Sequence, residues 1–441
     1  MRKHILIVLG LIVVLGAGVF FWMTRPDKAQ LPIEQVMGKT PKITPPRPQY
    51  FPTIGIAEPI GWQNGAKPTP AAGLAVDAFA TGLDHPRWMY RLPNGDVLVA
   101  ETNSPPREDS GIVAKVQKFL MGRAGAGVPS ANRITLLRDA DGDGRAESRS
   151  VLLSGLNSPF GMALVGEWLY VGNTDALVRF PFKVGQTRIE AKGEKIVDLP
   201  AAGNHWTRNV VANPNGNSLF VAVGSDSNIG ENGMDRERNR ATILEVFPDQ
   251  KRYRVYAAGL RNPVGMGINP VDQTLWTVVN ERDMIGSDVP PDYLTRVEFG
   301  GFYGWPWNYW GGYTDKRVEP QRLELREYTR RPDYALGPHT ASLGLSFAED
   351  IQLGDRFARG AFIGQHGSWN REPPAGYKVL FVPFAENGFP TGALPVEVLT
   401  GFLDSEGRAQ GRPVGVTGDK TGALLVADDV GNVIWRVRPA R

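Results

Sequence analysis

A histidine ahead of two short apolar runs is the stretch of this sequence with the clearest chemical potential. Residues 203–228 contain His205, one apolar run, a Pro-Asn-Gly turn and a second run, Leu219 to Val223. Because Pro214 fixes φ and Asn215-Gly216 tolerates positive φ, we predict a β-hairpin with His205 at the start of its first strand. A neutral imidazole can accept a proton, but a single histidine is more often a structural residue than a catalytic one. A site therefore requires other residues to converge on it.

The composition limits the classes of function. The chain has 441 residues, no cysteine, and a formal charge of +3 from 49 basic and 46 acidic residues. So balanced a charge predicts no nucleic-acid partner, and the lack of cysteine excludes disulfides and thiolate chemistry. The 52 glycines and 35 prolines separate strand-like runs, which indicates an all-β fold.

The N-terminus predicts a membrane segment. Arg2-Lys3-His4 precede an apolar run over 5–23, which at about 1.5 Å per residue can cross a layer of roughly 30 Å. We predict that 1–24 form an anchor or signal sequence, with retention favoured because no small-residue cleavage site follows. The basic flank places the rest outside the inner membrane, in the periplasm. The Pro-rich stretch 25–72 predicts an extended linker, although 51–62 could equally be an ordered tail on the domain.

A loose repeat runs through the remaining sequence, 73–441. Each unit has a polar opening, often Gly-Leu-x-x-Pro, then an apolar strand, a turn and a second apolar strand. Such repetition predicts radial blades, and we expect a six-bladed β-propeller. Between the first units, 113–121 are helix-like and amphipathic. The six units open near Gly82, Gly155, Gly203, Gly259, His339 and Gly411.

Propeller geometry brings the openings of all units to one mouth of the central channel. The sequence leaves open whether the ends of the second strands face the same mouth. The openings carry His85, Arg87, His205, Arg208, Arg261, Asn262, His339 and Arg412, and the strand ends carry Glu101, Asn103, Asp226, Asn280, Glu281 and Asp428.

One acidic loop has the spacing of a calcium site. Asp139, Asp141 and Asp143 alternate ahead of a glycine turn, as in a calcium-binding loop. The twelfth position is Ser150 and not a bidentate glutamate, which argues against an EF-hand. A structural Ca²⁺ and a bare acidic turn both fit the sequence.

These residues resemble a family, the pyrroloquinoline quinone (PQQ)-dependent glucose/sorbosone dehydrogenases, which are six-bladed propellers of the bacterial periplasm. The resemblance covers roughly 82–437. The anchored form and the chain length look closest to the membrane-bound sorbosone-dehydrogenase-like branch. The motifs that carry it are Gly203-Asn-His205 with Gly224-Ser-Asp, Gly259-Leu-Arg-Asn-Pro263, Gly300-Gly-Phe-Tyr-Gly-Trp-Pro306, and Arg412-Pro-Val-Gly with Asp428.

The resemblance implies PQQ and Ca²⁺ as cofactors and assigns roles to residues. His205 would be the general base, and Arg261 and Asn262 would contact the quinone end of PQQ. A catalytic Ca²⁺ would lie near Asn280 and Glu281. The cofactor's carboxylates call for bidentate partners, for which Arg208, Arg408 and Arg412 are the candidates. Trp369, beside His366, offers a planar face for the cofactor.

The sequence also departs from the family pattern. Val264 stands where a glutamine can follow the Asn-Pro pair, and the cofactor-binding lysine has no evident counterpart. Our leading hypothesis is oxidation of an aldose or hydrated sugar aldehyde to a lactone or acid, with electrons passing to a respiratory quinone or cytochrome. A calcium-dependent propeller lactonase and a propeller that only binds protein or glycan are the alternatives.

Overall fold

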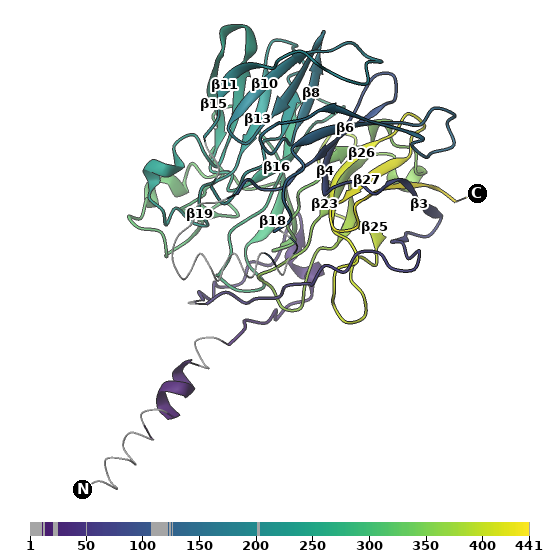
Figure 1. Ribbon diagram of the computed structural model, residues 1–441. Helices are drawn as coiled ribbons and strands as arrows, with labels where there is room; N and C mark the ends of the chain where they lie inside the picture. The colour runs from purple at the N-terminus through teal and green to yellow at the C-terminus, as the bar shows by residue number, and fades with distance from the viewer. Residues whose placement is uncertain are drawn as a thin grey trace, which may run out of the picture.

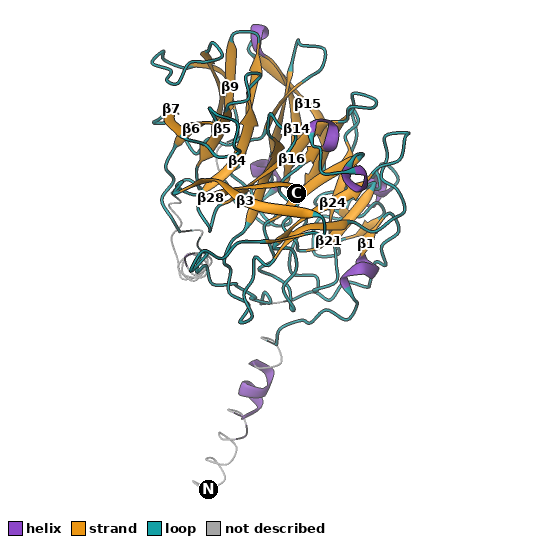
Figure 2. Cartoon of the chain, turned by 90° about the vertical axis from the view of Figure 1, so that its right-hand side faces the viewer, coloured by secondary structure: helices purple, strands orange, loops and turns teal. Residues whose placement is uncertain are grey.

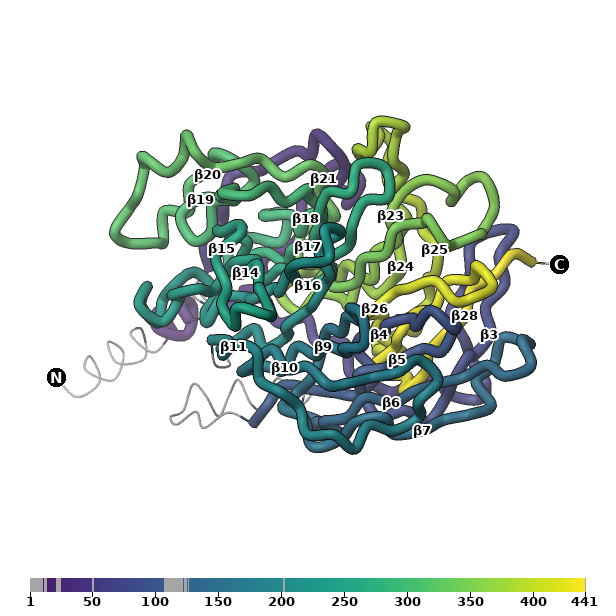
Figure 3. Tube along the Cα trace, turned by 90° about the horizontal axis from the view of Figure 1, so that it is seen from above, coloured from purple at the N-terminus to yellow at the C-terminus, as the bar shows by residue number. Residues whose placement is uncertain are grey.

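The computed structural model describes residues 11, 14–20, 25–49, 51–106, 122, 125, 127–200 and 203–440. Within these residues, six β-sheets of four or five strands surround a common axis, as Figures 1 and 2 show. Each innermost strand contacts the innermost strands of both neighbouring sheets. In Figure 3, β4, β16 and β26 lie near the middle and β3, β7 and β21 lie toward the rim. The all-β, six-bladed propeller predicted from the sequence is confirmed.

The blades follow the chain order of the repeats. The first blade contains β4 (Pro86–Arg91), β5 (Val97–Glu101), β6 (Arg133–Arg138) and β7 (Ser148–Leu153). The second contains β8 (Met162–Val165), β9 (Trp168–Gly172), β10 (Ala176–Pro181) and β11 (Glu194–Asp198). The third contains β12 (Val210–Ala212), β13 (Leu219–Val223), β14 (Thr242–Phe247) and β15 (Arg252–Ala258). The fourth blade contains β16 (Pro263–Ile268), β17 (Leu275–Val279), β18 (Pro291–Arg296), β21 (Tyr334–Pro338) and β1 (Met37–Gly38). The fifth contains β22 (Ser346–Phe347), β23 (Gly360–Gln365), β24 (Lys378–Pro383), β25 (Val396–Thr400) and β2 (Thr69–Pro70).

The sixth blade joins the two ends of the domain. It contains β26 (Pro413–Gly418), β27 (Leu424–Asp428), β28 (Val433–Pro439) and, from the N-terminal side, β3 (Leu74–Thr81). Because β3 pairs with the last strand, with Thr81 opposite Val433, the ring closes through backbone hydrogen bonds. The smaller elements are β19 (Asn308–Tyr309), β20 (Tyr313–Thr314) and the 3-10 helices η1 (Ile33–Val36), η2 (Met234–Glu237), η3 (Pro248–Gln250), η4 (Leu323–Arg326), η5 (Ala348–Asp350) and η6 (Asp355–Phe357).

The hydrophobic core fills the spaces between neighbouring blades. Val97 and Val99 of β5, for example, share one buried cluster with Leu425 and Ala427 of β27. Because both faces of a blade are covered by its neighbours, the second strands are apolar at nearly every position and do not alternate. This packing holds the strand ends at fixed positions around the axis.

Strand register settles which loops share the mouth. Pro86 pairs with Glu101, Pro263 with Val279 and Pro413 with Asp428, so in these blades the first residue of the inner strand lies opposite the last residue of the next strand. In the other three blades the first inner residue pairs within three residues of that end. The loops that precede the inner strands and those that follow the second strands are therefore at the same end of the propeller. We refer to this end as the mouth.

The N-terminal predictions are only partly covered by the structure. Among the described residues, no helix is long and apolar enough to cross a membrane. The anchor predicted over 1–24 lies largely outside the described residues, as does the helix predicted over 113–121. Residues 25–49 and 51–62 are mostly irregular and run along the lower side of the domain in Figure 1.

Candidate functional site at the propeller mouth

His205 and Asn262 meet at the mouth on either side of Gly224. A Cβ atom on Gly224 would lie 2.5 Å from both Asn262 Oδ1 and His205 Cβ, so the two atoms are at most twice that distance apart. The predicted hairpin forms, but β12 begins at Val210, and His205 lies in the loop before it. Just ahead of β12, Asn209 O accepts from Ala222 N of β13 (3.0 Å) and Arg208 O accepts from Gly161 N of the neighbouring blade (3.0 Å), so the end of this loop is held between two blades.

The surroundings of the His205 ring define its tautomer. Nδ1 lies 2.9 Å from Ser225 O and 3.0 Å from Ser225 Oγ, whose own hydrogen is donated to Ser227 O. Both oxygens can only accept from Nδ1, so Nδ1 carries the proton and Nε2 carries the lone pair. The ring is half-buried, and Nε2 is the atom suited to accept a substrate proton.

Arg261, next to Asn262, uses all three guanidinium nitrogens within the protein. Nε donates to Asn228 O (3.1 Å), Nη1 to Glu281 O (2.7 Å) and Asn280 O (3.3 Å), and Nη2 to Asn228 Oδ1 (2.9 Å). Nη2 also lies 3.3 Å from Asp283 Oδ2. A ligand contact by Arg261 would have to replace one of these bonds, so its predicted contact with the quinone stays a prediction.

The oxygens of residues 280 and 281 suit a hard cation. Their two consecutive carbonyls converge on one point, where Arg261 Nη1 lies. Glu281 Oε1 is buried and has no hydrogen-bond partner among the described residues, while Oε2 accepts from Arg282 Nε (3.0 Å). Carbonyl and carboxylate oxygens are the ligands Ca²⁺ prefers, so this group fits the ion if the guanidinium withdraws. The predicted catalytic Ca²⁺ remains a prediction.

His339 and Asp283 hold the loop that follows β17. The two nitrogens of His339 lie 3.2 Å from Asp283 Oδ1 and 2.9 Å from Gly286 O. Burial lowers the pKa of His339, but the hydrogen bond and charge of Asp283, aided by the Gly286 carbonyl, outweigh it and the net pKa is raised. With an acceptor at each nitrogen, the ring is favoured as the imidazolium.

We expect this imidazolium to make stability depend on pH. A histidine whose pKa is raised by folding stabilises the protein fully below its unfolded pKa, about 6.5, and the contribution is lost as the pH rises through the folded value. The free energy of unfolding, measured by urea titration at a series of pH values, should thus fall above pH ~6.5. His339→Gln should flatten this fall; equal slopes in the two proteins would contradict the assignment.

A second polar group at the mouth consists of residues from blades one, five and six. Asp429 accepts from the Arg87 guanidinium, and its Oδ2 lies 2.8 Å from His366 Nε2 and 3.5 Å from His85 Nε2. Burial opposes its charge, yet His366, His85 and Arg87 hold the pKa of Asp429 well below its usual range. Arg87 also lies 5.8 Å from the Trp206 ring, which links this group to the His205 loop.

The N-terminal segment borders the same mouth. Ala57 O accepts from Arg412 Nη2 (2.9 Å), and Trp62 Nε1 donates to Asp428 (2.7 Å). Gly55 N donates to the carbonyl of Trp369, whose side chain is 44% exposed. Arg412 and Trp369, both predicted cofactor contacts, are therefore at the mouth, beside residues 51–62.

Two other predicted cofactor contacts, Arg208 and Arg408, are bonded to protein groups. Arg208 is fully buried and donates to the carbonyls of His205 (3.0 Å), Thr207 and Pro200, so it supports the His205 loop from behind. Burial lowers its pKa to about 9. Arg408 lies on the surface in ion pairs with Asp404 and Glu406. The sequence spacing of these arginines did not reveal which way each side chain points.

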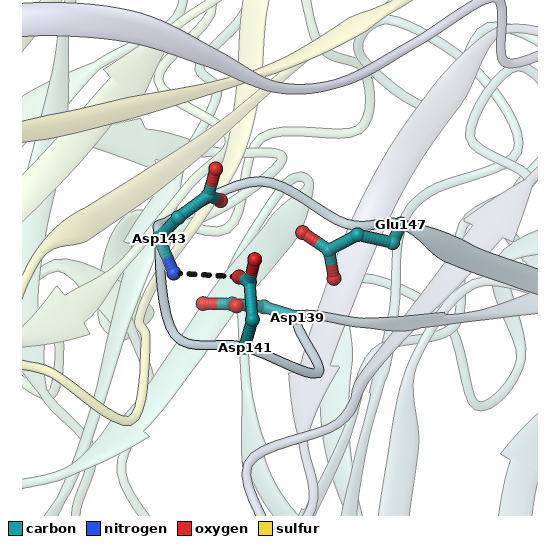
Figure 4. Close-up of side chains that lie close together, drawn as sticks. All are labelled: Asp139, Asp141, Asp143 and Glu147. Atoms are coloured by element: carbon teal, nitrogen blue, oxygen red, sulfur yellow. Dashed lines mark hydrogen bonds between the residues drawn. The ribbon is translucent and has the colours of Figure 1, made fainter.

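The predicted acidic loop forms a compact group far from the mouth. Asp139, Asp141, Asp143 and Glu147 place one carboxylate oxygen each within 4.8 Å of one another (Figure 4). The loop connects β6 to β7 at the end of the first blade opposite the mouth, so an ion there would be structural. Glu147 is an additional member of this group.

We expect Ca²⁺ to test this loop directly. If the group binds the ion, Ca²⁺ should raise the Tm of the wild type by a few degrees relative to chelator, since binding to the folded state alone stabilises it. Asp141→Asn should reduce that shift. Equal shifts in differential scanning fluorimetry would identify a bare acidic turn.

Sequence reasoning missed two residues that organise the site. Asn228 accepts two hydrogen bonds from Arg261, and Asp429 joins Arg87, His85 and His366. Asp429 could have been found, because it directly follows a strand end that was already a candidate. Asn228 lies in a loop beyond its strand, and its role depends on the neighbouring blade.

Comparisons with known proteins agree with this architecture. The TrAA12-like family model matches residues 68–290 and 322–440. An uncharacterized protein of Borreliella burgdorferi is 29% identical over 235 residues, 53% of this chain and 60% of that protein. A PQQ-dependent pyranose dehydrogenase of Coprinopsis cinerea is 30% identical over 224 residues, 41% of this chain and 30% of that protein. The matches thus span less than two thirds of these relatives.

Solved structures share the fold. The PQQ domain of Coprinopsis cinerea pyranose dehydrogenase in its holo form superposes with a TM-score of 0.69 and 21% identity, covering 87% of this chain and all of that one. The calcium structure of the Trichoderma reesei carbohydrate-active enzyme of family AA12 has the same TM-score at 19% identity, covering 88% of this chain and 99% of that one.

Proposed function

The chain belongs to the TrAA12-like family, and from this premise we propose that it is a PQQ- and Ca²⁺-dependent oxidoreductase that converts an aldose or sugar aldehyde to a lactone or acid. The observation that carries the proposal is the meeting of His205 and Asn262 beside Gly224, next to the guanidinium of Arg261. A base, an amide and a cation at one opening suit the removal of the proton from a substrate hydroxyl and of the hydride from the carbon that carries it.

The donors at the mouth fit an anionic quinone. Arg87, Arg261 and Arg412 supply positive charge, opposed at close range by Asp429 and Asp283. Among the described residues, Arg87 Nε and Asn262 Oδ1 are buried without hydrogen-bond partners. Arg87 Nε can still donate to an anionic ligand, and Asn262 Oδ1 can accept only from a donor group of the ligand. Arg412, Trp369 and Asn262 would hold PQQ, and the oxygens of Asn280 and Glu281 would hold Ca²⁺. When bound, PQQ would supply the hydride acceptor.

His205 performs the proton transfer in this proposal. Nδ1 stays protonated on Ser225 O, so Nε2 accepts the proton of the substrate hydroxyl as the hydride leaves the same carbon. Arg208 holds the backbone carbonyl of His205, which limits the movement of the base. The position of the catalytic domain outside the inner membrane and a respiratory quinone or cytochrome as electron acceptor belong to the same proposal.

Reconstitution tests the function. The purified full-length protein is incubated with PQQ and Ca²⁺, and dye reduction is followed with a panel of aldoses and sugar aldehydes. We expect reduction that needs both the cofactor and at least one sugar. No reduction by any substrate, together with lactone hydrolysis by the cofactor-free protein, would favour a propeller lactonase instead.

A further inference from the structure

A cavity beside the mouth, between blades four and five, has no part in the group around His205. Its volume is about 480 Å³, and its walls include Ile33 of η1, Met37 of β1, and Arg371. Its lining residues Met37 and Lys378 belong to β1 and β24, which lie at the lower right of the domain in Figure 2. None of the residues that form the candidate active site lines it. Ligand pockets in proteins commonly measure ~300 to 1,000 Å³, so a small molecule fits.

The cavity contains a buried guanidinium with a free donor. Arg371 is 3% exposed; its Nε donates to Ser287 O (3.0 Å) and its Nη1 to Pro373 O (2.6 Å). Within the part of the chain that the structure describes, Nη2 donates to no protein atom. Asp288 attracts Arg371 electrostatically but does not accept a hydrogen bond from it. The Asp288 carboxylate accepts from Gln30 N (2.7 Å) and from the Arg47 guanidinium (3.4 Å). A buried charge without a hydrogen-bonded counterion costs free energy, which an anionic ligand would offset.

The remaining walls are mainly apolar. Pro32 and Ile33 face the cavity from the N-terminal segment, and Pro373 and Pro374 face it from the loop after β23. Lys378 also lines it, but its ammonium is paired with Glu397 (2.7 Å). Rigid proline rings and an isoleucine favour an apolar ligand body, with one charged group directed at Arg371.

We propose that this cavity binds a small organic anion, in which a carboxylate or similar acid contacts Arg371 and an apolar chain or ring lies against the N-terminal segment. The site shares no lining residue with the group around His205 and does not depend on the redox activity. Because residues 29–33 form one wall, the ligand would also fasten the N-terminal segment to the propeller.

Calorimetry with octanoate and its neutral counterpart octanamide tests the proposal on the full-length protein. We expect saturable octanoate binding, and octanamide binding weaker by about tenfold or more, because a charge-assisted hydrogen bond is lost. Arg371→Gln should weaken octanoate by a similar factor and leave octanamide unchanged. Ile33→Trp, which fills the cavity, should abolish binding of both.

The matched control is Ile54→Trp, at a 47% exposed position of the N-terminal segment that does not line the cavity. It should leave both affinities unchanged. The absence of saturable octanoate binding to the wild type would overturn the proposal. Equal octanoate affinity in the wild type and Ile33→Trp would do the same, even if Arg371→Gln does not fold.

Discussion

Replacing His205 with asparagine is expected to reduce kcat by about 10²- to 10⁴-fold while PQQ still binds. In the wild type, Nδ1 donates a hydrogen bond to Ser225 O, and the amide of an asparagine can donate the same bond. The loop should therefore keep its shape. The atom removed is Nε2, which bears the lone pair. Stopped-flow measurement of cofactor reduction by sugar gives the rate, and fluorescence quenching on PQQ addition gives the affinity.

Ser225→Ala is the control for this substitution. It removes the hydroxyl beside Nδ1 but keeps the carbonyl that fixes the tautomer, so kcat should change little. Unchanged turnover in His205→Asn would reject His205 as the base. A parallel loss of PQQ affinity would instead assign the histidine to cofactor binding.

Replacing Arg261 with methionine should lower the free energy of unfolding by about 2–4 kcal/mol, because it leaves buried acceptors without a donor and takes from Asp283 one of its two cationic partners, the other being His339. The guanidinium is 4% exposed and connects Asn228, in the loop after β13, to the loop after β17. Without it, Asp283 and the carbonyls of 280 and 281 lose a donor. Urea denaturation of the cofactor-free protein, followed by tryptophan fluorescence, measures the change.

A surface arginine provides the comparison. Arg188 pairs with Glu190 at 3.7 Å, and both side chains are more than three-quarters exposed. Arg188→Met should therefore change stability by less than about 1 kcal/mol. If Arg261→Met proved as mild, the guanidinium would not be what joins the two loops.

The polar residues of the mouth form two groups that come from different blades. His205, Asn262 and Arg261 come from blades three and four, and Arg87, His366 and Asp429 from blades one, five and six. Burial and the nearby guanidinium of Arg87 hold the pKa of His366 to about 4, against the opposing effect of Asp429. His366 is consequently neutral at physiological pH, so the positive charge of this group comes from arginines.

Local sequence was sufficient for the fold class and for the identity of several mouth residues. Hairpins such as the one from Val210 to Val223 depend on a turn of a few residues, and each blade repeats this local unit. Since a propeller brings equivalent positions of every unit together, the openings containing His205, Arg261 and Arg412 could be expected at one end. The acidic loop was likewise visible from its spacing alone.

Tertiary structure alone decided which way the polar side chains point and what they contact. Arg208 and Arg261 both precede inner strands, yet Arg208 turns inward to backbone carbonyls and Arg261 spans two loops. Asn228 and Asp429 gained their roles from neighbouring blades, and residues 51–62 were placed against the mouth by contacts hundreds of residues away. The physical reason is that a buried charge takes whatever partners the packed blades bring within hydrogen-bonding distance, and sequence spacing does not contain that information.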